Sequence, residues 1–461
     1  MRYFEKSSML PVSADEAYAW HAWPAAFERL SPPWQSIRVL DRQGDLGKGT
    51  VTLEIRLGPI RVRWVARHGD AEPGRRFVDE QVEGPFAKWR HTHLFEPGGA
   101  ASCRYVDRIE YELPAGAFGS LAAGRVAREL RRTFDYRHAT VAADLAARAR
   151  FASRGPRAFV ISGMTGLIGR QLAPFLRAGG HRVQGLVRAV AGPEDIRWDP
   201  ATGRLDAERL EGADAVVHLA GEPIGAGRWT QERRRRILES RRLGTALLAE
   251  TLARLRRPPQ VLVCASAVGI YGDRGDELLS ETTPLETGPS ISFVERVGHA
   301  WEAASAPAEL AGIRVVRLRT GIVLSPQGGA LARLLPVFRA GLGGRIGTGE
   351  QYMSWIGLDD VIGAVHHVVF TDAARGPVNA TAPMPVTNAE FTSTLGTVLG
   401  RPTVLPVPAA ALRAVFGAMA DELLLASARV MPERLLALGY PFRHRDLEAA
   451  LRHQLGRYLT A

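Results

Sequence analysis

Residues 162–169 read SGMTGLIG and follow directly on the apolar run AFVI at residues 158–161. Apolar residues at helical spacing come next, between Leu167 and Leu176. A buried strand, a glycine-rich turn and a helix in this order are typical of a dinucleotide-binding site, whereas a glycine string without that context would be weak evidence. The stretch therefore predicts the first strand, turn and helix of a doubly wound α/β parallel sheet, a Rossmann fold.

The glycines of this turn have separate physical roles. Gly163 allows the tight turn, Gly166 lets the backbone approach a pyrophosphate, and Gly169 permits close packing of the helix on the strand. The helix N-terminus adds unpaired N–H groups and a partial positive charge, which favour a phosphate. The predicted cofactor-binding residues of the turn are Gly163, Thr165, Gly166, Leu167, Ile168 and Gly169.

The composition is that of a globular protein with more than one domain. The chain has 461 residues, 46% of them hydrophobic and 23% charged, which is too long for one ordinary core. Cys103 and Cys264 are too few for a disulfide framework, and the start, MRYFEK, has no signal-peptide core. No apolar run is long enough to span a bilayer. We expect a cytoplasmic protein of two or three domains.

The net charge of +11 comes almost wholly from arginine and raises the question of nucleic-acid binding. The densest run, Arg233 to Arg236, is followed by Arg241 and Arg242. Leucine and isoleucine at helical spacing surround these arginines, so we expect most of them to cover an exposed helix face. No aromatic residues are interleaved as stacking platforms for bases, and we predict no nucleic-acid partner.

Alternation of apolar and polar residues dominates the first 115 residues. Ser13 and Glu16 have capping-box spacing and predict a short helix from Ala14. Alternating runs on both sides of the turn at 58–59 predict a hairpin with one apolar face. Further strands are expected at 76–82, 87–95 and 102–113, with a second short helix at 25–30 and a long helix at 121–149.

One strand, short helices, a run of antiparallel strands and a long final helix resemble the α+β helix-grip fold of the START-like (SRPBCC), polyketide-cyclase-type superfamily. The phrases GPF at 84–86 and WRH at 89–91 support this resemblance. It implies a sheet wrapped around the last helix and a lipid-type, apolar ligand cup within residues 1–152. A linker with Gly155 and Pro156 and no periodicity then predicts a domain boundary.

His91 and His93 alternate on one predicted strand face with Trp89 and Phe95. The two histidines could be metal ligands or acid–base groups of the cup, or they could be ordinary residues of a sheet. Because no third ligand is obvious nearby in the sequence, we predict that they hold no metal.

Strands and helices alternate after the glycine turn, as a doubly wound sheet requires. The second to fifth strands are expected at 181–187, 213–219, 261–265 and 313–318. A site that prefers NAD places an acid at the end of the second strand to hold the ribose 2′-hydroxyl. This chain has Arg188 there, which favours the 2′-phosphate of NADP(H); the alternative is a surface arginine that does not discriminate.

Five motifs in order make the remaining chain recognisable. The segment from 157 to about 455 resembles the SDR39U/YfcH-like, epimerase-family branch of extended short-chain dehydrogenases/reductases, in the NAD-dependent epimerase/dehydratase family. The motifs are GEPI (221–224), RWT (228–230), SAVGIYG (266–272), RTGIVL (319–324) and SWI (354–356), followed by a C-terminal stretch from Ala420 to Tyr440.

The resemblance implies an NADP(H)-binding Rossmann domain at 157–400 and a C-terminal helical module at 401–461 that completes the substrate cleft. After the third predicted strand, Leu219, Ala220 and Gly221 would line the cofactor. Glu222, Arg228 and Trp229 would lie near the nicotinamide, as a Glu–Arg pair that is structural or anchors a polar substrate. Trp355 would form a wall of the cleft, and Asp359-Asp360 would cap the helix that follows.

The family's Tyr-x-x-x-Lys pair is missing at the expected place. Val294 stands at the tyrosine position and Gly298 at the lysine position, and the only lysines are Lys6, Lys48 and Lys88. The lysine of such a pair lowers the tyrosine pKa for proton exchange. Ser266 keeps the position that orients a substrate hydroxyl; the alternative is a structural turn. Tyr271 could donate a proton, or it could flank the substrate as the comparable aromatic residue does in relatives. His299 on the same helix is better explained by packing.

Two functions of different classes therefore stay open. The first is an NADP(H)-dependent oxidoreductase or epimerase-like enzyme that acts on a small, hydrophobic molecule held or delivered by the first domain. The second is a non-catalytic sensor of NADPH or ligand with a regulatory role, for which a link to cell division is known among relatives. The missing tyrosine–lysine pair is what keeps the second open.

Overall fold

A computed structural model describes residues 1–114, 117–189 and 192–459. The chain forms two compact units, each described here by itself. The first consists mainly of Met1–Gly155, and the second comprises Pro156–Leu176 and His181–Gln454. Among the described residues, no helix has both the length and the apolar character needed to cross a membrane.

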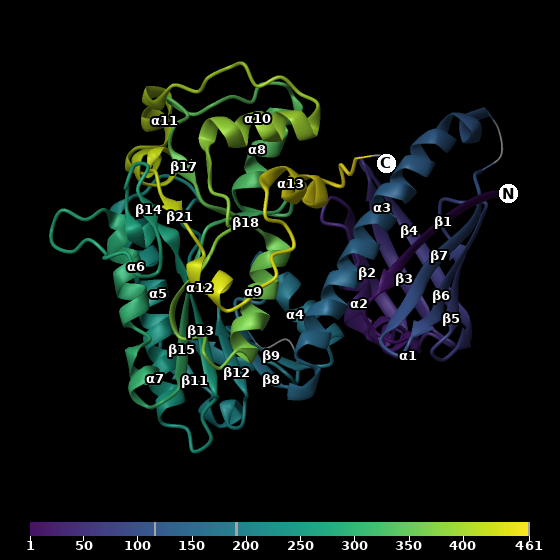
Figure 1. Cartoon of the computed structure of the whole chain (residues 1–461), viewed down its shortest axis with the longest axis horizontal. Coiled ribbons are helices and arrows are strands. Elements are labelled where there is room, and N and C mark those ends of the chain that lie inside the picture. Colours follow the sequence, from purple (N-terminus) through teal and green to yellow (C-terminus); the bar gives the residue numbers. More distant parts are fainter. Residues whose placement is uncertain (115–116, 190–191, 460–461) are drawn as a thin grey trace. The chain divides into compact units, whose positions relative to one another are not determined.

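The first unit is an antiparallel sheet with a long helix, as the helix-grip resemblance implied. The seven strands lie in the order β1-β7-β6-β5-β4-β3-β2, and α3 packs against β1 (Figure 1). The elements are β1 (Arg2–Leu10), α1 (Ala14–Ala22), α2 (Pro24–Arg29), β2 (Ser36–Gln43), β3 (Thr50–Leu57), β4 (Ile60–Glu72), β5 (Arg76–Glu83), β6 (Lys88–Gly99), β7 (Ser102–Glu112) and α3 (Ala117–Arg150).

Local sequence signals set most of these elements. The Ser13 side chain accepts from the Glu16 N–H, and the Glu16 carboxylate accepts from the Ser13 N–H, so the predicted capping box is confirmed. The β3–β4 hairpin turns at Gly58, whose φ is +64°. The strand β2 was missed because its apolar positions are interrupted by charged residues. Trp20, Phe95 and Leu145 are buried in the core between α1, the sheet and α3.

The second unit is the predicted doubly wound sheet. Its eight strands lie in the order β11-β10-β9-β8-β12-β13-β15-β19, all parallel except for β11 at the edge (Figure 1). The strands are β8 (Ala158–Ser162), β9 (Arg182–Val187), β10 (Ile196–Asp199), β11 (Arg204–Leu205), β12 (Ala215–His218), β13 (Val261–Ala267), β15 (Arg314–Thr320) and β19 (Gly376–Ala380).

This order places β8 at the topological switch point, between β9 and β12. The sequence analysis missed β10 and β11, so the strand predicted third, β12, is the fifth strand of this sheet along the chain. The strand β10 contains only four residues, IRWD, and is too short to show a period. The principal helices of this part are α4 (Gly169–Ala178), α5 (Gln231–Ala253), α6 (Phe293–Ala303), α7 (Ala306–Leu310), α8 (Gly329–Arg339), α9 (Leu358–Phe370) and α10 (Asn388–Leu399).

The C-terminal segment is mainly helical and is joined to the sheet domain by backbone pairing. Its strand β21 (Arg429–Val430) pairs with β14 (Leu278–Leu279). Before this segment, β16 (Ile322–Leu324) pairs in parallel with β18 (Trp355–Gly357), and β17 (Tyr352–Met353) pairs antiparallel with β20 (Val386–Thr387). The helical elements of the C-terminal segment are α11 (Ala409–Phe416), the π-helical turn η4 (Ala420–Leu425), α12 (Glu433–Ala437) and α13 (Leu447–Leu455).

The expectation that Asp359-Asp360 cap α9 is wrong. The N-cap is Gly357, and both aspartates lie buried in the first turn. The Asp360 carboxylate accepts hydrogen bonds from the N–H of Arg443 (2.7 Å), the N–H of His444 (3.1 Å) and the hydroxyl of Tyr440 (3.0 Å). The Asp360 carboxylate therefore binds the C-terminal segment instead of the N-terminal N–H groups of α9.

Substitution of Gly163 by alanine should destabilise the second unit more than a matched change at Gly203. Both residues have positive φ, +73° and +70°, which costs a non-glycine residue about 1–2 kcal/mol. A Cβ at Gly203 meets nothing within 4 Å, whereas one at Gly163 lies 2.9 Å from Ala220 N and Leu219 C. The clash adds about 1–3 kcal/mol. Equal denaturation midpoints for Gly163→Ala and Gly203→Ala would contradict this packing.

Candidate functional site

The glycine turn lies where β8 ends, beside the end of β12. Gly163 has a φ of +73°, and its backbone is so close to Leu219 and Ala220 that a side chain would clash. The Gly166 N–H donates to Gly163 O at 2.9 Å and closes the turn. A Cβ on Gly169 would lie 2.3 Å from Gly163 O, so this glycine lets α4 begin against the turn. In the first turn of α4, the N–H groups of Arg170, Gln171 and Leu172 already donate to Gly166 O or Ile168 O. Just before the helix, the N–H groups of Leu167 and Ile168 have no backbone acceptor among the described residues and can bind an anion.

A buried serine and histidine join the two strands beneath this turn. The Ser162 hydroxyl accepts from the N–H groups of Leu219 (3.1 Å) and Ala220 (3.2 Å), and lies 2.7 Å from His218 Nδ1. Burial, with the charge of Arg241, lowers the pKa of His218 to about 4, so the ring is neutral. The sequence analysis did not identify this pair, although each polar residue ends an otherwise apolar strand.

The loop after β12 differs from the predicted Glu–Arg pairing. Arg228 is exposed and donates to Ala414 O, while Glu222 lies 3.8 Å from Arg233 instead. Trp229 donates to Ile224 O (2.9 Å) and packs edge-on against Phe293, with ring centroids 5.1 Å apart. Arg228 therefore does not pair with Glu222, and Trp229 fixes the loop onto α6.

The arginine-rich helix α5 is only partly an exposed face. Arg235, Arg236 and Arg242 are exposed as expected. Arg241 is buried: its guanidinium donates to Glu222 O (2.9 Å) and lies 4.7 Å from the Trp301 ring centroid. Burial lowers its pKa to about 10. Arg234 is half-buried over the rings of Trp229 and Phe293. The expectation fails there because a guanidinium can stack on aromatic faces.

Ser266 belongs to a buried polar network behind the carboxyl end of β13. Its hydroxyl donates to Glu302 Oε1 of α6 at 2.8 Å. The Arg319 guanidinium of β15 holds the same carboxylate with two hydrogen bonds, at 2.8 and 2.9 Å, and donates to the Tyr271 hydroxyl at 2.9 Å. Burial opposes the charge of Arg319, but Glu302 outweighs it and raises the pKa of the guanidinium.

Tyr271 has its hydroxyl at the centre of three structural contacts. Besides Arg319, the oxygen lies 2.9 Å from Ser280 O and 2.9 Å from Asn379 Oδ1. Burial raises the pKa of this phenol. Asn379 in turn donates to Met431 O of the C-terminal segment. These contacts make Tyr271 a connection between the sheet and that segment; a proton-donating role for it stays a prediction.

Three further residues singled out from the sequence lie at different places. Trp355 is fully buried and donates from Nε1 to Met384 O at 3.0 Å. His299 lies 2.9 Å from Glu286 O through Nε2. Arg188 is exposed just after β9, at the same sheet edge as the glycine turn. A residue that contacts the cofactor ribose must lie where Arg188 lies, at the end of this strand.

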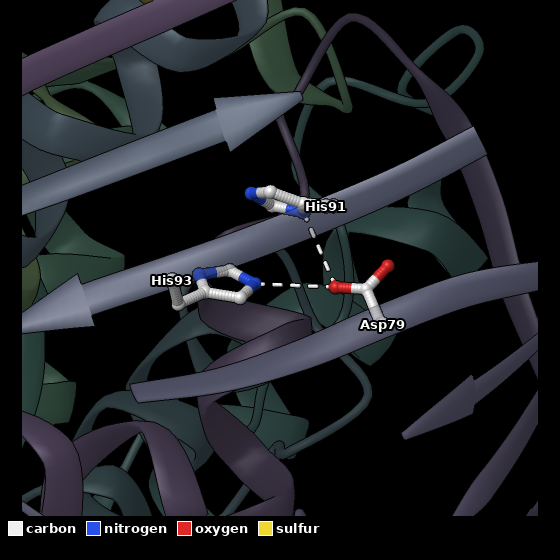
Figure 2. Close-up of side chains that lie close together, drawn as sticks. All are labelled: Asp79, His91 and His93. Atoms are coloured by element: carbon white, nitrogen blue, oxygen red, sulfur yellow. Dashed lines mark hydrogen bonds and ion pairs between the residues drawn. The ribbon is translucent and has the colours of Figure 1, made fainter. Parts of the chain in front are cut away.

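A second cluster of chemically active groups lies inside the first unit (Figure 2). Asp79 of β5 lies beside His91 and His93 of β6, with its Oδ2 3.2 Å from His91 Nδ1 and 3.2 Å from His93 Nε2. The reason given for predicting no metal, that no third ligand lies nearby, is therefore wrong, because Asp79 is close enough to be one. The aspartate comes from the neighbouring strand, 12 residues before His91, and only strand pairing reveals it.

Asp107 of β7 lies on the other side of the same histidines. Its Oδ1 is 2.9 Å from His91 Nε2 and 2.8 Å from His93 Nδ1, and it accepts from the Tyr105 hydroxyl at 2.9 Å. Its Oδ2 lies 3.0 Å from His138 Nε2 of α3. Burial opposes the charge of both aspartates, yet the histidines lower their pKa values. Burial also opposes protonation of His91, but Asp79 and Asp107 raise its pKa to about 9.

Three different family models match three separate parts of the chain. The model of the NAD dependent epimerase/dehydratase family matches residues 159–380, and that of polyketide cyclase / dehydrase and lipid transport matches residues 10–138. A domain of unknown function matches residues 407–454. An epimerase family protein of Mycobacterium bovis is 42% identical over 292 residues, which is 63% of this chain and 95% of that protein.

The chain belongs to the NAD dependent epimerase/dehydratase family. Epimerase family protein SDR39U1 of Homo sapiens is 38% identical over 297 residues, 64% of this chain and 98% of that protein. The nucleoside-diphosphate sugar epimerase of Corynebacterium glutamicum has a TM-score of 0.81 at 33% identity and covers 98% of this chain, with 90% of its own length covered. The fused architecture predicted from the sequence is thus confirmed.

This epimerase-family chain has no room for the missing lysine in α6. A Cβ on Gly298 would lie 2.7 Å from Ile270 Cβ, and one on Gly269 would lie 2.4 Å from Val294 Cγ1. The helix therefore packs directly on the 3-10 turn η3 (Val268–Tyr271). The N–H of Val294 donates to the Glu422 carboxylate of η4 at 3.0 Å. The C-terminal segment thus reaches the position where the tyrosine would stand.

His218 should make the second unit lose stability in mild acid. Its folded pKa of about 4 lies below the ordinary 6.5, so the unfolded chain binds a proton that the folded chain does not. The stability that depends on a neutral His218 is fully present above pH 6.5. As the pH falls towards 4, the free energy of unfolding decreases by up to about 3 kcal/mol for this reason. The variant His218→Asn should show a shallower fall in the free energy of unfolding across this range. An unchanged slope, matching that of a His299→Asn control, would contradict the assignment.

Proposed function

We propose that the second unit binds NADP(H) and acts as an oxidoreductase or epimerase-like enzyme on a small, hydrophobic molecule. The observation that carries this proposal is the turn at Gly163–Gly169, held against the end of β12 at the switch point of a parallel sheet. Ligands of open α/β sheets bind at this place. The human SDR39U1 structure, 36% identical over 64% of this chain with a TM-score of 0.59, contains NADPH.

Each predicted cofactor residue has a physical task in this proposal. The N–H groups of Leu167 and Ile168, in the turn just before α4, would bind the pyrophosphate. Leu219, Ala220 and Gly221 continue from β12 beside the turn and would lie along the dinucleotide. Arg188, exposed at the end of β9, would bind the 2′-phosphate. The bound nicotinamide would supply or accept a hydride.

Ser266 is the residue that we propose to touch the substrate. Its hydroxyl already donates to Glu302, whose second oxygen is held by Arg319, so the serine oxygen has a fixed orientation. A lone pair of that oxygen can accept a hydrogen bond from a substrate hydroxyl. Glu302 and Arg319 act as positioning residues. Glu222, Arg228, Trp229 and Trp355 stay predictions as lining of the substrate cleft.

The first unit is proposed to hold an apolar small molecule, in line with its match to the polyketide cyclase and lipid transport family. Its interior contains an aromatic group around Trp89, Tyr111 and Phe134. These side chains offer an apolar contact surface of the kind that small-molecule sites use. The buried interior also contains the histidine–aspartate cluster, so we propose a ligand with one polar end over a pure hydrocarbon.

A sensor that binds NADPH without turnover is the second candidate. The observation that favours it is the chain's lack of lysine beyond residue 88, together with the close packing at Gly298 that excludes a long side chain there. A dinucleotide site without a proton-exchanging pair can still bind the cofactor. Activity is therefore the deciding property.

The coenzyme preference tests the cofactor assignment. Calorimetric titration should show tighter binding of NADPH than of NADH, and Arg188→Ala should weaken NADPH binding about tenfold while leaving NADH unchanged, because an exposed charge–phosphate pair contributes about 1–1.5 kcal/mol. Arg182→Ala is the matched control, since Arg182 is also exposed on β9 and pairs with Glu194 at 3.1 Å. Equal losses for the two variants, or no binding of either coenzyme, would refute the assignment.

Turnover tests the enzyme against the sensor. Purified protein is mixed with NADPH and a panel of ketones, quinones and nucleotide sugars, and the absorbance of NADPH is followed. We expect turnover with at least one compound, and a loss of about 100-fold or more in Ser266→Ala, as removal of a group that orients the proton usually costs. Ser290→Ala, an exposed loop residue, is the control. Coenzyme binding without turnover across the panel would favour the sensor.

A further inference from the structure

Two distances in the cluster inside the first unit fit a metal site. Asp79 Oδ2, His91 Nδ1 and His93 Nε2 are mutually within 4.8 Å, and the carboxylate oxygen is 3.2 Å from each nitrogen. Two ligands of one ion, with bonds near 2.1 Å, lie about 3 to 3.5 Å apart. Figure 2 shows the three side chains pointing to one place between neighbouring strands. Two imidazoles and one carboxylate form a donor set that divalent transition metals prefer.

The surrounding residues have the arrangement of outer-shell partners. The far nitrogens, His91 Nε2 and His93 Nδ1, both lie within 3 Å of Asp107 Oδ1. Metal-binding histidines almost always direct their other nitrogen to a carboxylate or carbonyl, which fixes the ring. Asp107 is fixed in turn by Tyr105 and His138, and His138 Nδ1 lies 2.8 Å from Ser8 Oγ. Thus the partners on one side are ordered independently of any ion.

One buried histidine nitrogen beside the cluster has no hydrogen-bond partner among the described residues. His21 Nδ1 lies 2.8 Å from Ala17 O, a pure acceptor, so Nδ1 carries the proton. Burial lowers the pKa of His21 to about 3, which leaves a lone pair on Nε2. That Nε2 is buried and has no hydrogen-bond partner among the described residues. The His21 ring lies 6.1 Å from the His93 ring. It can accept a hydrogen bond from a water or ligand bound to the cluster.

We propose that Asp79, His91 and His93 bind a divalent transition metal ion such as Zn²⁺ or Fe²⁺, with Asp107 as the carboxylate that orients both histidines. Three protein ligands leave further coordination positions for water or for the polar end of a small molecule in the first unit. This site is separate in its residues from the dinucleotide turn, so it stands or falls independently of the proposed coenzyme.

Cobalt titration of the full chain tests the proposal. Protein freed of metal with a chelator is titrated with Co²⁺, and the visible absorption of the ion is followed; Zn²⁺ is then added as competitor. We expect one Co²⁺ per chain and displacement by Zn²⁺. Asp79→Asn and His91→Ala should abolish the absorption at one equivalent, and Asp107→Asn should weaken binding about 10–100-fold. His299→Ala, which changes a histidine of α6 in the second unit that contacts Glu286 O, should bind as the parent does.

Metal binding by the unsubstituted protein tests the proposal even if a variant fails to fold. Circular dichroism is recorded for every variant, and the thermal midpoint is measured with and without Zn²⁺, which should raise it only where the three ligands are intact. Failure of the folded parent protein to bind Co²⁺ or Zn²⁺ at millimolar concentration would overturn the proposal. So would unchanged binding in folded Asp79→Asn, which would place the ion elsewhere.

Discussion

The close approach of two strand ends determines the nucleotide-binding half of this protein. Gly163 turns against Leu219 and Ala220 with no space for a side chain, and Ser162 accepts the N–H groups of both residues from below. The turn is therefore fixed to β12 by hydrogen bonds as well as by contact. Because α4 starts from this turn, the N–H groups of Leu167 and Ile168 just before the helix have a fixed direction before any ligand arrives. Preorganisation of this kind lowers the cost of binding.

The side chains of α6 and of the chain after β13 differ from the tyrosine–lysine pair that the family resemblance implies. Gly298 packs on Ile270 where a lysine would stand, and the Val294 N–H is taken by Glu422 from the C-terminal segment. In their place the structure has a buried chain of hydrogen bonds from Ser266 through Glu302 and Arg319 to Tyr271. This network orders the serine and also connects β13, α6 and β15.

Sequence patterns predicted what depends on neighbours along the chain. The glycine turn, the capping box at Ser13 and the doubly wound order come from local signals or from regular alternation. The missed features arise from partners far apart in sequence. Asp79 lies beside the histidines because their strands are neighbours in the sheet. Arg241 of α5 contacts Trp301 of α6, and Asp360 accepts a hydrogen bond from the backbone of Arg443. The spacing of residues along the chain does not predict such contacts. Burial also turns these charged side chains from solvent-exposed groups into hydrogen-bonding partners inside the fold.

The central claim is that the backbone between Gly163 and Gly169 binds the pyrophosphate of a nicotinamide dinucleotide. A crystal structure grown with NADPH tests it directly. The account predicts electron density for the pyrophosphate within hydrogen-bond distance of the N–H groups of Leu167 and Ile168, with the 2′-phosphate near Arg188. Density for the coenzyme at another place, with the turn empty at saturating NADPH, would contradict it.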